Sequence, residues 1–289
     1  MRMPILLPLV LSVLAAAPGC ATALAGRYAP DEHHVYREID GTRLEIHVFL
    51  PAGKPAALRP AVLFFHGGSW TRGGPQRFFP HARELANRGM VGLSAAYRLR
   101  GTQGTGVAEA LDDAKAAYAW VLSHADQLGI DPARVAVAGG SAGGQLAAGI
   151  ALLDPVPPVP PAALVLYNPA LDMHPDDFDG LLGWAVRPRL ERLFAGRFDE
   201  LSPTRHVRAG APPAALFHGT GDFIVPVEQS REFCARLAAV HTLCELFEYP
   251  DAQHGSFNFG WGRHYQDAVR ETARFLAEVG LLPAIPEVR

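Results

Sequence analysis

The stretch RVAVAGGSAGGQLAAGI, residues 134–150, decides the fold of this chain. It begins as an apolar, β-branched run, turns at paired glycines on both sides of Ser141, and continues as an alanine-rich helical segment. Residues 139–143 fit the pattern G-x-S-x-G, in which small neighbours allow a sharp turn that holds a serine hydroxyl above the edge of a sheet. Ser141 is therefore a candidate nucleophile. The alternative at this point is a glycine-rich turn without chemistry.

Length and charge narrow the class of protein. The chain has 289 residues, enough to bury a full core, and α/β folds of this size commonly form one domain. Its 26 basic and 29 acidic residues leave a net charge of −3, with no long run of either sign. This pattern gives no reason to expect nucleic acid or an anionic membrane surface as a partner. Small or neutral substrates fit better.

The first 25 residues have the pattern of an export signal. Arg2 precedes an apolar stretch at residues 5–17, which is shorter than the ~20 residues needed to cross a bilayer and is followed by small residues and an A-x-A cleavage motif. We predict a signal peptide over residues 1–25, a single catalytic domain over residues 26–289, and a periplasmic or secreted protein. The alternative is a lipoprotein anchored through Cys20, which follows a glycine after the apolar run.

Strand-like runs alternate with helical segments along the rest of the chain. Residues 44–50 alternate apolar and polar, so we expect a half-buried strand at a sheet edge. Residues 61–65 are apolar throughout, as in a parallel strand covered on both faces. The pattern predicts the α/β class, a mostly parallel central sheet with helices on both faces. An irregular insertion at residues 171–206 is too short for a separate cap domain. Further expected strands are 90–96, 162–167, 214–217 and 243–249, and expected helices are 76–88, 107–124, 228–240 and 265–279.

Activation of the serine needs a histidine further along the chain. A serine hydroxyl is a weak nucleophile until a base takes its proton, and a third group must orient that base. In this type of fold the chain order is serine, acid, histidine, and working groups gather beyond the C-terminal ends of parallel strands. His254 follows the strand that ends at residue 249, whereas His241 lies in a helix-to-strand link and His264 opens the last helix. His254 is therefore the favoured base.

The acid is sought in the loop after the strand at residues 214–217. Asp222 lies in this polar loop, at the same end of the sheet as Ser141, and is the leading candidate. Asp172, after the preceding strand, and Asp251, beside the histidine, are the alternatives, although most aspartates in such places cap helices or close turns.

Backbone N–H groups would stabilise the oxyanion that forms on the attacked carbonyl. Fixed amides suit this purpose because they are oriented before the reaction starts. One is expected from Ala142, directly after the nucleophile, and others from Gly68 and Ser69, in the turn after the strand at residues 61–65. Removing one such donor typically costs ~3 kcal/mol of barrier stabilisation.

Five separated motifs resemble those of the α/β-hydrolase esterases in the acetyl esterase and hormone-sensitive-lipase-like group, which includes bacterial acetyl-xylan and feruloyl esterases. The resemblance runs from about residue 44 to residue 279 and implies a serine carboxylesterase with Ser141, Asp222 and His254 as its triad. Many relatives have a third glycine where this chain has Ser69, and we expect the serine to be tolerated through a negative φ angle. The motifs are HGGSW at 66–70, AYR at 96–98, GIDPARVAVAGGSAGGQLA at 129–147, HGTGD at 218–222 and DAQHGSF at 251–257.

The expected activity is hydrolysis of short-chain, acetyl-type esters on carbohydrate or small alcohols. No long apolar lid is visible, which favours an open pocket for short acyl groups. Trp70, Phe223, Phe257 and Trp261 are candidate pocket residues, and each is equally compatible with core packing. Two other functions stay open: an amidase or peptidase with the same triad, such as an arylformamidase, and a non-catalytic carbohydrate-binding hydrolase homologue.

No cofactor or metal is expected, and the two remaining cysteines could form a disulfide or stay as free thiols. The charged cluster at residues 31–34 is interpreted as solvated rather than as a metal site. Export would place Cys234 and Cys244 in an oxidising compartment, on a helix and on the strand after it. A disulfide between them would stabilise the fold by ~2–3 kcal/mol. Two buried free thiols are the alternative.

Overall fold

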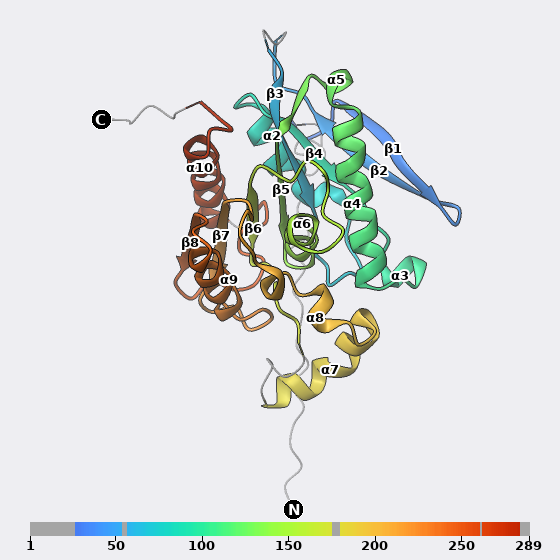
Figure 1. The fold of residues 1–289 in the computed structure, drawn as a ribbon, viewed down its shortest axis with the longest axis vertical. Coiled ribbons are helices and arrows are strands. Elements are labelled where there is room, and N and C mark those ends of the chain that lie inside the picture. Colours follow the sequence, from blue (N-terminus) through green and yellow to red (C-terminus); the bar gives the residue numbers. More distant parts are fainter. Residues whose placement is uncertain (1–26, 54–56, 175–179, 261, 284–289) are drawn as a thin grey trace, which may run out of the picture.

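The computed structural model describes residues 27–53, 57–174, 180–260 and 262–283 (Figure 1). These residues form one eight-stranded sheet, in the order β1-β2-β4-β3-β5-β6-β7-β8, with helices packed on both faces. The α/β fold class predicted from the sequence is confirmed. The predicted signal peptide and Cys20 lie outside the described residues, so export stays a prediction. Within the described part of the chain, no helix has both the length and the apolar composition needed to cross a membrane.

The sheet is parallel from β4 to β8 and antiparallel at its other end. Strands β4, β3, β5, β6, β7 and β8 run parallel to their neighbours, whereas β2 pairs antiparallel with β4 and β1 pairs antiparallel with β2. The strands are β1 Glu32–Ile39, β2 Thr42–Phe49, β3 Arg59–Phe65, β4 Val91–Ala95, β5 Ile130–Gly140, β6 Leu164–Tyr167, β7 Ala214–Gly219 and β8 Cys244–Tyr249.

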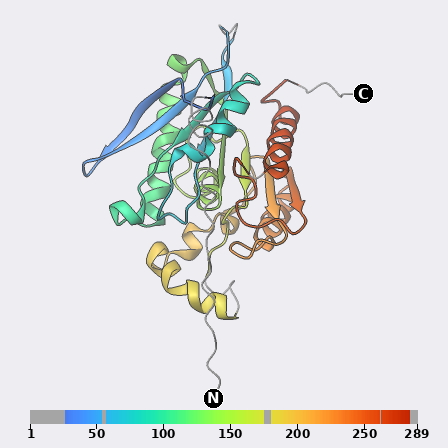
Figure 2. The ribbon, with the colours of Figure 1, turned by 180° about the vertical axis from the view of Figure 1, so that it is seen from behind.

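Two helical layers cover the sheet. Helices α4, α6 and α9 contribute to the apolar cluster on one face, and α2 and α10 contribute to the cluster on the other, which Figure 2 shows from behind. The helices are η1 Pro75–Phe78, α2 Phe79–Ala86, α3 Arg100–Gln103, α4 Val107–Ser123, α5 Ala125–Leu128, α6 Ala142–Leu152, α7 Gly180–Phe194, α8 Phe198–Leu201, η3 Pro203–His206, α9 Glu228–Ala239 and α10 Arg263–Glu278.

Strand β3 shows why the central strands are apolar at every position. Leu63 and Phe65 belong to the cluster under α4 and α6, while Val62 and Phe64 belong to the cluster under α2 and α10. Successive side chains of a strand point to opposite faces, so a strand covered on both sides must be apolar throughout. All four of these side chains are fully buried.

The antiparallel end of the sheet differs from the sequence prediction. The strand expected at the edge, β2, lies one place inside it, because β1 pairs along its outer side. The charged residues interpreted as a solvated cluster therefore begin a strand, with Glu32 as its first residue. Strand β1 is polar and half-exposed, and two side-chain contacts hold it. The Tyr36 hydroxyl donates to the Ala96 carbonyl at 2.7 Å, and Arg37 lies 2.9 Å from Asp113.

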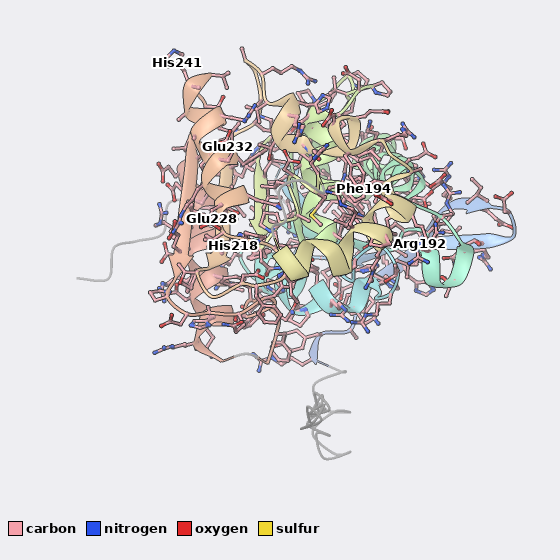
Figure 3. The ribbon with its side chains drawn as sticks, turned by 90° about the horizontal axis from the view of Figure 1, so that it is seen from below. Arg192, Phe194, His218, Glu228, Glu232 and His241 are labelled. Carbon is pink, nitrogen blue, oxygen red and sulfur yellow. A yellow bond between two sulfur atoms is a disulfide. The ribbon has the colours of Figure 1, made fainter. Side chains whose placement is uncertain are left out.

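The insertion at residues 171–206, predicted to be irregular, contains helical segments. Helix α7 crosses the end of the molecule toward which the parallel strands point, followed by α8 and η3 (Figures 1 and 3). Leu190, Leu193 and Phe194 are buried and join the core cluster around α4 and α6. Pro188, inside α7, obscures the helix in the sequence because proline normally ends one. Among the described residues of this segment, α7, α8 and η3 are the elements that lie at the end of the sheet where the parallel strands finish.

Candidate active site

Ser141 lies in a strained turn between β5 and α6. Its backbone angles are φ 54° and ψ −122°, a combination that costs a non-glycine residue about 1–3 kcal/mol and is found mainly at functional sites. A Cβ atom on Gly143 would lie only 2.0 Å from the Phe65 carbonyl oxygen, so this position requires glycine. The close packing of β3 against the turn fixes the serine at the carboxyl end of the sheet, as the G-x-S-x-G motif indicates.

The structure brings Ser141, His254 and Asp222 into one hydrogen-bonded row. His254 Nε2 lies 3.0 Å from Ser141 Oγ, and His254 Nδ1 lies 2.6 Å from Asp222 Oδ2. The three residues come from three separate loops, after β5, β7 and β8. With Nδ1–H donating to the carboxylate, the second nitrogen of the ring is left to accept the serine proton. Of the alternative acids, Asp172 instead pairs with Arg205 at 2.9 Å.

The Asp222 carboxylate is buried and has four donors. Its Oδ1 atom accepts the backbone N–H groups of Ile224, at 2.9 Å, and Val225, at 3.0 Å. Its Oδ2 atom faces both His254 and His218. Burial by itself raises the pKa of Asp222, but the hydrogen bonds from the two histidines and from Val225 more than offset this, so the pKa lies well below its ordinary value. The group is therefore an anion at neutral pH.

His218 supports Asp222 and was given no role in the sequence analysis. The ring is fully buried, with Nε2 lying 2.9 Å from the Val225 carbonyl and 3.3 Å from Asp222 Oδ2. Both of these atoms are acceptors, so Nε2 carries the proton. Nδ1 lies 2.7 Å from the Ser230 hydroxyl of α9, the helix beside His218 in Figure 3. Its place at the end of β7, four residues before Asp222, is the signal that could have identified it.

The turn at residues 66–70 lies directly against the serine. A Cβ atom on Gly67 would lie 2.9 Å from the Gly140 carbonyl oxygen and 3.2 Å from Ser141 Cβ. Gly68 has φ 132°, and its carbonyl accepts the N–H groups of Thr71 and Arg72. Gly68 and Ser69 line the pocket at Ser141.

The negative φ angle expected for Ser69 is not observed. Its φ angle is +52°, not negative, and Trp70 follows with φ +56°. Two consecutive non-glycine residues in this region are unfavourable, at about 1–2 kcal/mol each, and the turn is held by its own hydrogen bonds and by the burial of Trp70. The third proposed donor, the N–H of Ala142, opens α6 and has no acceptor within its own helix.

A pocket of about 180 Å³ opens at Ser141 and His254. Phe257, which is buried, lines it as predicted. Trp70 and Phe223 do not, and both are corrections to the sequence prediction. The indole of Trp70 points into the core, where Nε1 donates to Gln145 Oε1 at 3.2 Å and the ring packs on Phe194. Trp261 lies outside the described residues.

Phe223 is turned outward by the acid that precedes it. Because Asp222 binds the N–H groups of the two residues after Phe223, the loop folds back on itself. Phe223 is then 66% exposed, and Ile224 lines the pocket in its place. The sequence identified the correct loop but not the direction of its side chains.

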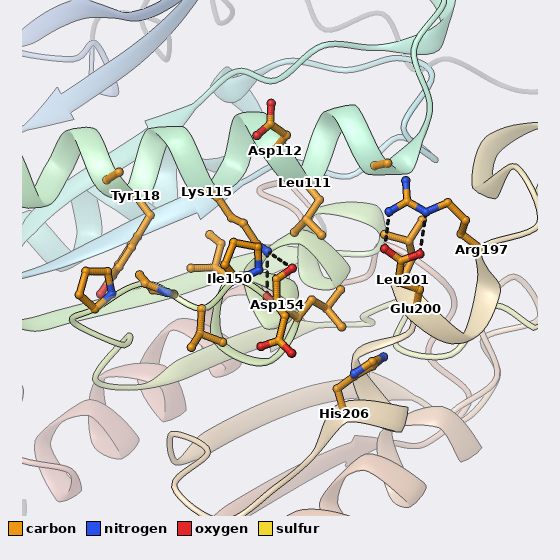
Figure 4. A pocket seen from close by; sticks show the side chains of 17 residues that line it. Leu111, Asp112, Lys115, Tyr118, Ile150, Asp154, Arg197, Glu200, Leu201 and His206 are labelled. Atoms are coloured by element: carbon orange, nitrogen blue, oxygen red, sulfur yellow. Dashed lines mark hydrogen bonds and ion pairs between the residues drawn. The ribbon is translucent and has the colours of Figure 1, made fainter.

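A second cavity, of about 670 Å³, lies between α4, the end of α6 and α8 (Figure 4). It is larger than the pocket at Ser141 but shares no lining residue with it. Lys115 donates from Nζ to the carbonyls of Leu153 and Asp154, and Arg197 pairs with Glu200. Asp112 and Asp154 pair with arginines outside the cavity, Arg37 and Arg208, so these charged groups already have protein partners.

Two further sequence predictions concern cysteines and metals. Cys234 of α9 and Cys244 of β8 form a disulfide, with their Cα atoms 5.3 Å apart. Among the described residues there is no group of three histidine, cysteine, aspartate or glutamate side chains arranged to hold a metal ion.

Comparison with known proteins places this geometry in a family. A family model described as alpha/beta hydrolase fold matches residues 62–258. The chain is 31% identical to a probable carboxylic ester hydrolase, LipM, of Mycobacterium tuberculosis, over 76% of this chain and 54% of LipM. It is 30% identical to the esterase LipC of the same organism, over 91% of this chain and 68% of LipC. The chain thus spans about half the length of LipM.

Solved structures agree. An esterase of Thermogutta terrifontis with propionate bound superposes with a TM-score of 0.80 at 37% identity, covering 88% of this chain and 96% of that chain. The same esterase phosphorylated by paraoxon gives a TM-score of 0.78 at 37% identity, with the same coverage. The resemblance to esterases inferred from the motifs is confirmed. The chain belongs to the alpha/beta hydrolase fold family, among the carboxylesterases of that fold.

Proposed function

We propose that this protein hydrolyses short-chain acyl esters through an acyl-enzyme formed on Ser141. The observation that carries the proposal is the row of contacts in which His254 Nε2 lies 3.0 Å from Ser141 Oγ while Nδ1 lies 2.6 Å from Asp222. Distances of 2.6–3.2 Å are those across which a general base takes a proton from a nucleophile. We therefore propose Ser141, His254 and Asp222 as the catalytic residues.

The reaction has two halves that use the same residues. Ser141 Oγ attacks the ester carbonyl carbon while its proton passes to His254 Nε2, and the oxyanion that forms is held by N–H groups of Gly68, Ser69 and Ala142. Collapse of this intermediate expels the alcohol, which takes the proton from His254, and leaves an acyl group on Ser141. Water then attacks the acyl carbon with His254 as base, and the acid is released. Asp222 holds the imidazole and stabilises its positive charge throughout.

The size of the pocket supports a short acyl group. Its volume of about 180 Å³ lies below the roughly 300–1,000 Å³ of sites that hold drug-sized ligands. Phe257, Phe78 and Ile224 give it apolar walls. The esterase of Thermogutta terrifontis has been solved with propionate and with butyrate bound. Acetyl-type esters on small alcohols or on carbohydrate are the substrates we infer.

An acyl-chain series tests this proposal. We expect kcat/KM for p-nitrophenyl esters to be highest between acetate and butyrate and to fall steeply beyond hexanoate. Acetylated xylan, assayed in parallel by acetate release, tests the carbohydrate substrate. Ser141→Ala should show no turnover above background. Equal or better hydrolysis of p-nitroanilides would favour an amidase, and absence of turnover with every ester would contradict the proposal.

Export is the second part of the proposal. We infer that residues 1–25 direct the protein out of the cytoplasm, and the disulfide between Cys234 and Cys244 supports this because such bonds persist in oxidising compartments. Fractionation of cells that express the full chain, followed by N-terminal sequencing, should give an exported protein that begins near residue 26. A mature chain that begins with acylated Cys20 would show a lipoprotein, and an intact cytoplasmic chain would contradict export.

A further inference from the structure

The pocket at Ser141 has an uneven charge. Arg72 and Arg77 line it, and no aspartate or glutamate is among the described residues that do. Its other polar side chains are uncharged hydroxyls and amides, including Asn168 and Asn258, and the imidazole of His254. For a protein whose net charge is −3, this is a local excess of positive charge at the opening above the nucleophile.

Neither of these two guanidinium groups is engaged. Both side chains are exposed, and within the described part of the chain neither forms an ion pair or a side-chain hydrogen bond. Other arginines of the molecule do pair. Arg98 binds Asp113 at 2.8 Å, and Arg231 binds Glu248 at 2.7 Å. The two free arginines are thus at the mouth of the catalytic pocket, where a bound substrate would meet them.

The backbone fixes where the two groups stand. Arg72 follows the turn at residues 66–70, and its N–H donates to the Gly68 carbonyl at 3.2 Å. Arg77 lies in η1, beside Phe78, whose ring stacks on Phe64 in the core. The two arginines therefore lie on one short, well-anchored segment that also supplies two of the three proposed oxyanion donors, Gly68 and Ser69.

The positive charge of Arg77 acts on His66, which lies next to the pocket. Burial lowers the pKa of His66 to about 4; the hydrogen bond from its Nδ1 to the Gly67 carbonyl opposes that shift, and the positive charge of Arg77 adds to it. His66 opens the turn that contacts Ser141, so the positive potential extends from the pocket mouth toward the proposed oxyanion site.

We propose that the preferred substrates are esters that also carry a carboxylate, which binds Arg72 and Arg77 while the ester carbonyl lies at Ser141. The inference rests on the proposed esterase function and names its substrate class. A guanidinium presents parallel N–H donors that match a carboxylate, and a contact at the rim of a pocket adds attraction without the cost of full burial. Half-esters of dicarboxylic acids and acyl esters of hydroxy acids have this chemistry.

Two pairs of esters test the proposal. On the acyl side, p-nitrophenyl hemiglutarate is compared with p-nitrophenyl pentanoate, which has the same number of acyl carbons and the same leaving group. On the alcohol side, 4-acetoxybenzoate is compared with 4-acetoxybenzamide. The quantity measured is the ratio of kcat/KM for the anionic ester to that for its neutral partner, divided by the same ratio for alkaline hydrolysis, so that intrinsic reactivity cancels.

We expect this normalised ratio to exceed one for at least one pair in the wild-type protein. In the double variant Arg72→Gln/Arg77→Gln it should fall about ten-fold, the effect of one charge-assisted contact. Raising the ionic strength of the wild-type assay from about 0.01 M to 0.5 M should lower it as well, because salt screens exposed charges. Arg43→Gln is the matched control. This arginine of β2 is also exposed and forms no ion pair or side-chain hydrogen bond within the described residues, but it lies away from the pocket, and its loss should leave the ratio unchanged.

The outcomes separate the two proposals. If the neutral esters are hydrolysed but the wild-type ratio is one or less for both pairs, or if the double variant keeps the wild-type ratio, the carboxylate preference is wrong and the esterase function stands. If the double variant does not fold, the same ratio is measured for Arg72→Gln and Arg77→Gln separately and for the wild-type protein at high salt. A ratio that stays at the wild-type value in all three measurements shows that the carboxylate preference is wrong. If no ester in either pair is cleaved, the esterase function itself is contradicted.

Discussion

The cavity beside α4 and the pocket at Ser141 differ in chemistry, and the larger of the two is not the one at Ser141. The cavity beside α4 has about 670 Å³ and the pocket at Ser141 about 180 Å³. The larger one is lined by charged groups that already have protein partners, and no serine, threonine or cysteine is among its described lining residues. The smaller one lies where β5, β7 and β8 end, and it is lined by Ser141 and His254, with Asp222 bound to the other nitrogen of the imidazole. In this fold the reactive side chains gather at the carboxyl ends of the parallel strands, because side chains from distant segments meet there on rigid supports.

The largest effect should come from the acid. Asp222→Asn is expected to lower kcat by about 10³- to 10⁴-fold, because an amide can donate to His254 Nδ1 and so favour the tautomer that cannot accept the serine proton. Asp154→Asn, which changes a carboxylate in the larger cavity in the same way, should leave kcat within two-fold. Ester hydrolysis by both variants measures this, and similar losses in the two would remove the distinction between the cavities.

The next effect should come from the turn beside the serine. A Cβ atom on Gly68 would lie 1.8 Å from the Arg72 carbonyl oxygen, so Gly68→Ala must move the backbone that supplies an oxyanion donor. We expect kcat to fall about 10²- to 10³-fold. Gly41→Ala is the control, since Gly41 also has a positive φ, of 73°, but nothing lies within 4 Å of its added Cβ. An equal loss of activity in the control would show that backbone strain alone explains the effect.

A smaller effect is expected at His218, which we infer to be a positioning residue for Asp222. His218→Leu removes the donor that lies 3.3 Å from the carboxylate, and kcat should fall about ten-fold with KM nearly unchanged. His218→Gln keeps an N–H donor and should recover part of the loss. Activity is expressed per folded protein, measured by circular dichroism. Unchanged kcat in the leucine variant would show that His218 only fills space.

The smallest effect concerns how the free energy of unfolding depends on pH, through the buried histidines His66 and His81. Burial lowers the pKa of His66 to about 4 and that of His81 to about 3, from an ordinary value of 6.5. Below about pH 6.5 the unfolded chain binds protons that the folded chain does not, so stability falls with pH from 6.5 toward 4 and 3. Each histidine should cost about 2 kcal/mol between pH 7 and pH 5.

Urea unfolding at pH 7 and pH 5 measures this dependence. His81→Gln keeps an N–H donor for the Phe257 carbonyl, which His81 Nε2 contacts at 3.2 Å, and should show a distinctly smaller loss than the wild-type protein. Equal losses in the two proteins would exclude His81 as a source of the pH dependence.

The sequence predicted the parts of the molecule whose pattern has a single physical cause. The apolar runs at β3 and β5 must be covered on both faces, so the parallel sheet follows from them. The loops after β5, β7 and β8 could be selected because parallel strands end on one side of a sheet. Strand β1 was missed because it is half-exposed and polar, and α7 because Pro188 interrupts its pattern.

Side-chain direction within a loop was the part that sequence could not supply. Trp70 points into the core because both it and Ser69 adopt positive φ angles, which no residue type at these positions requires. Phe223 points outward because Asp222 binds the amides beyond it. His218 was passed over although its place at the end of β7, four residues before Asp222, was visible in the sequence, because the contact between its ring and the carboxylate appears only in the structure.

The central claim is that Ser141 is a nucleophile activated by His254 and Asp222, and trapping it is the most direct test. The protein is treated with paraoxon, which phosphorylates the related esterase of Thermogutta terrifontis, and the adduct is located by intact mass and peptide mapping. We predict one diethylphosphoryl group, on the peptide that contains Ser141, with none on Ser141→Ala and a much slower reaction in Asp222→Asn. Absence of an adduct on the wild-type protein, or an adduct at any other residue, would contradict the account.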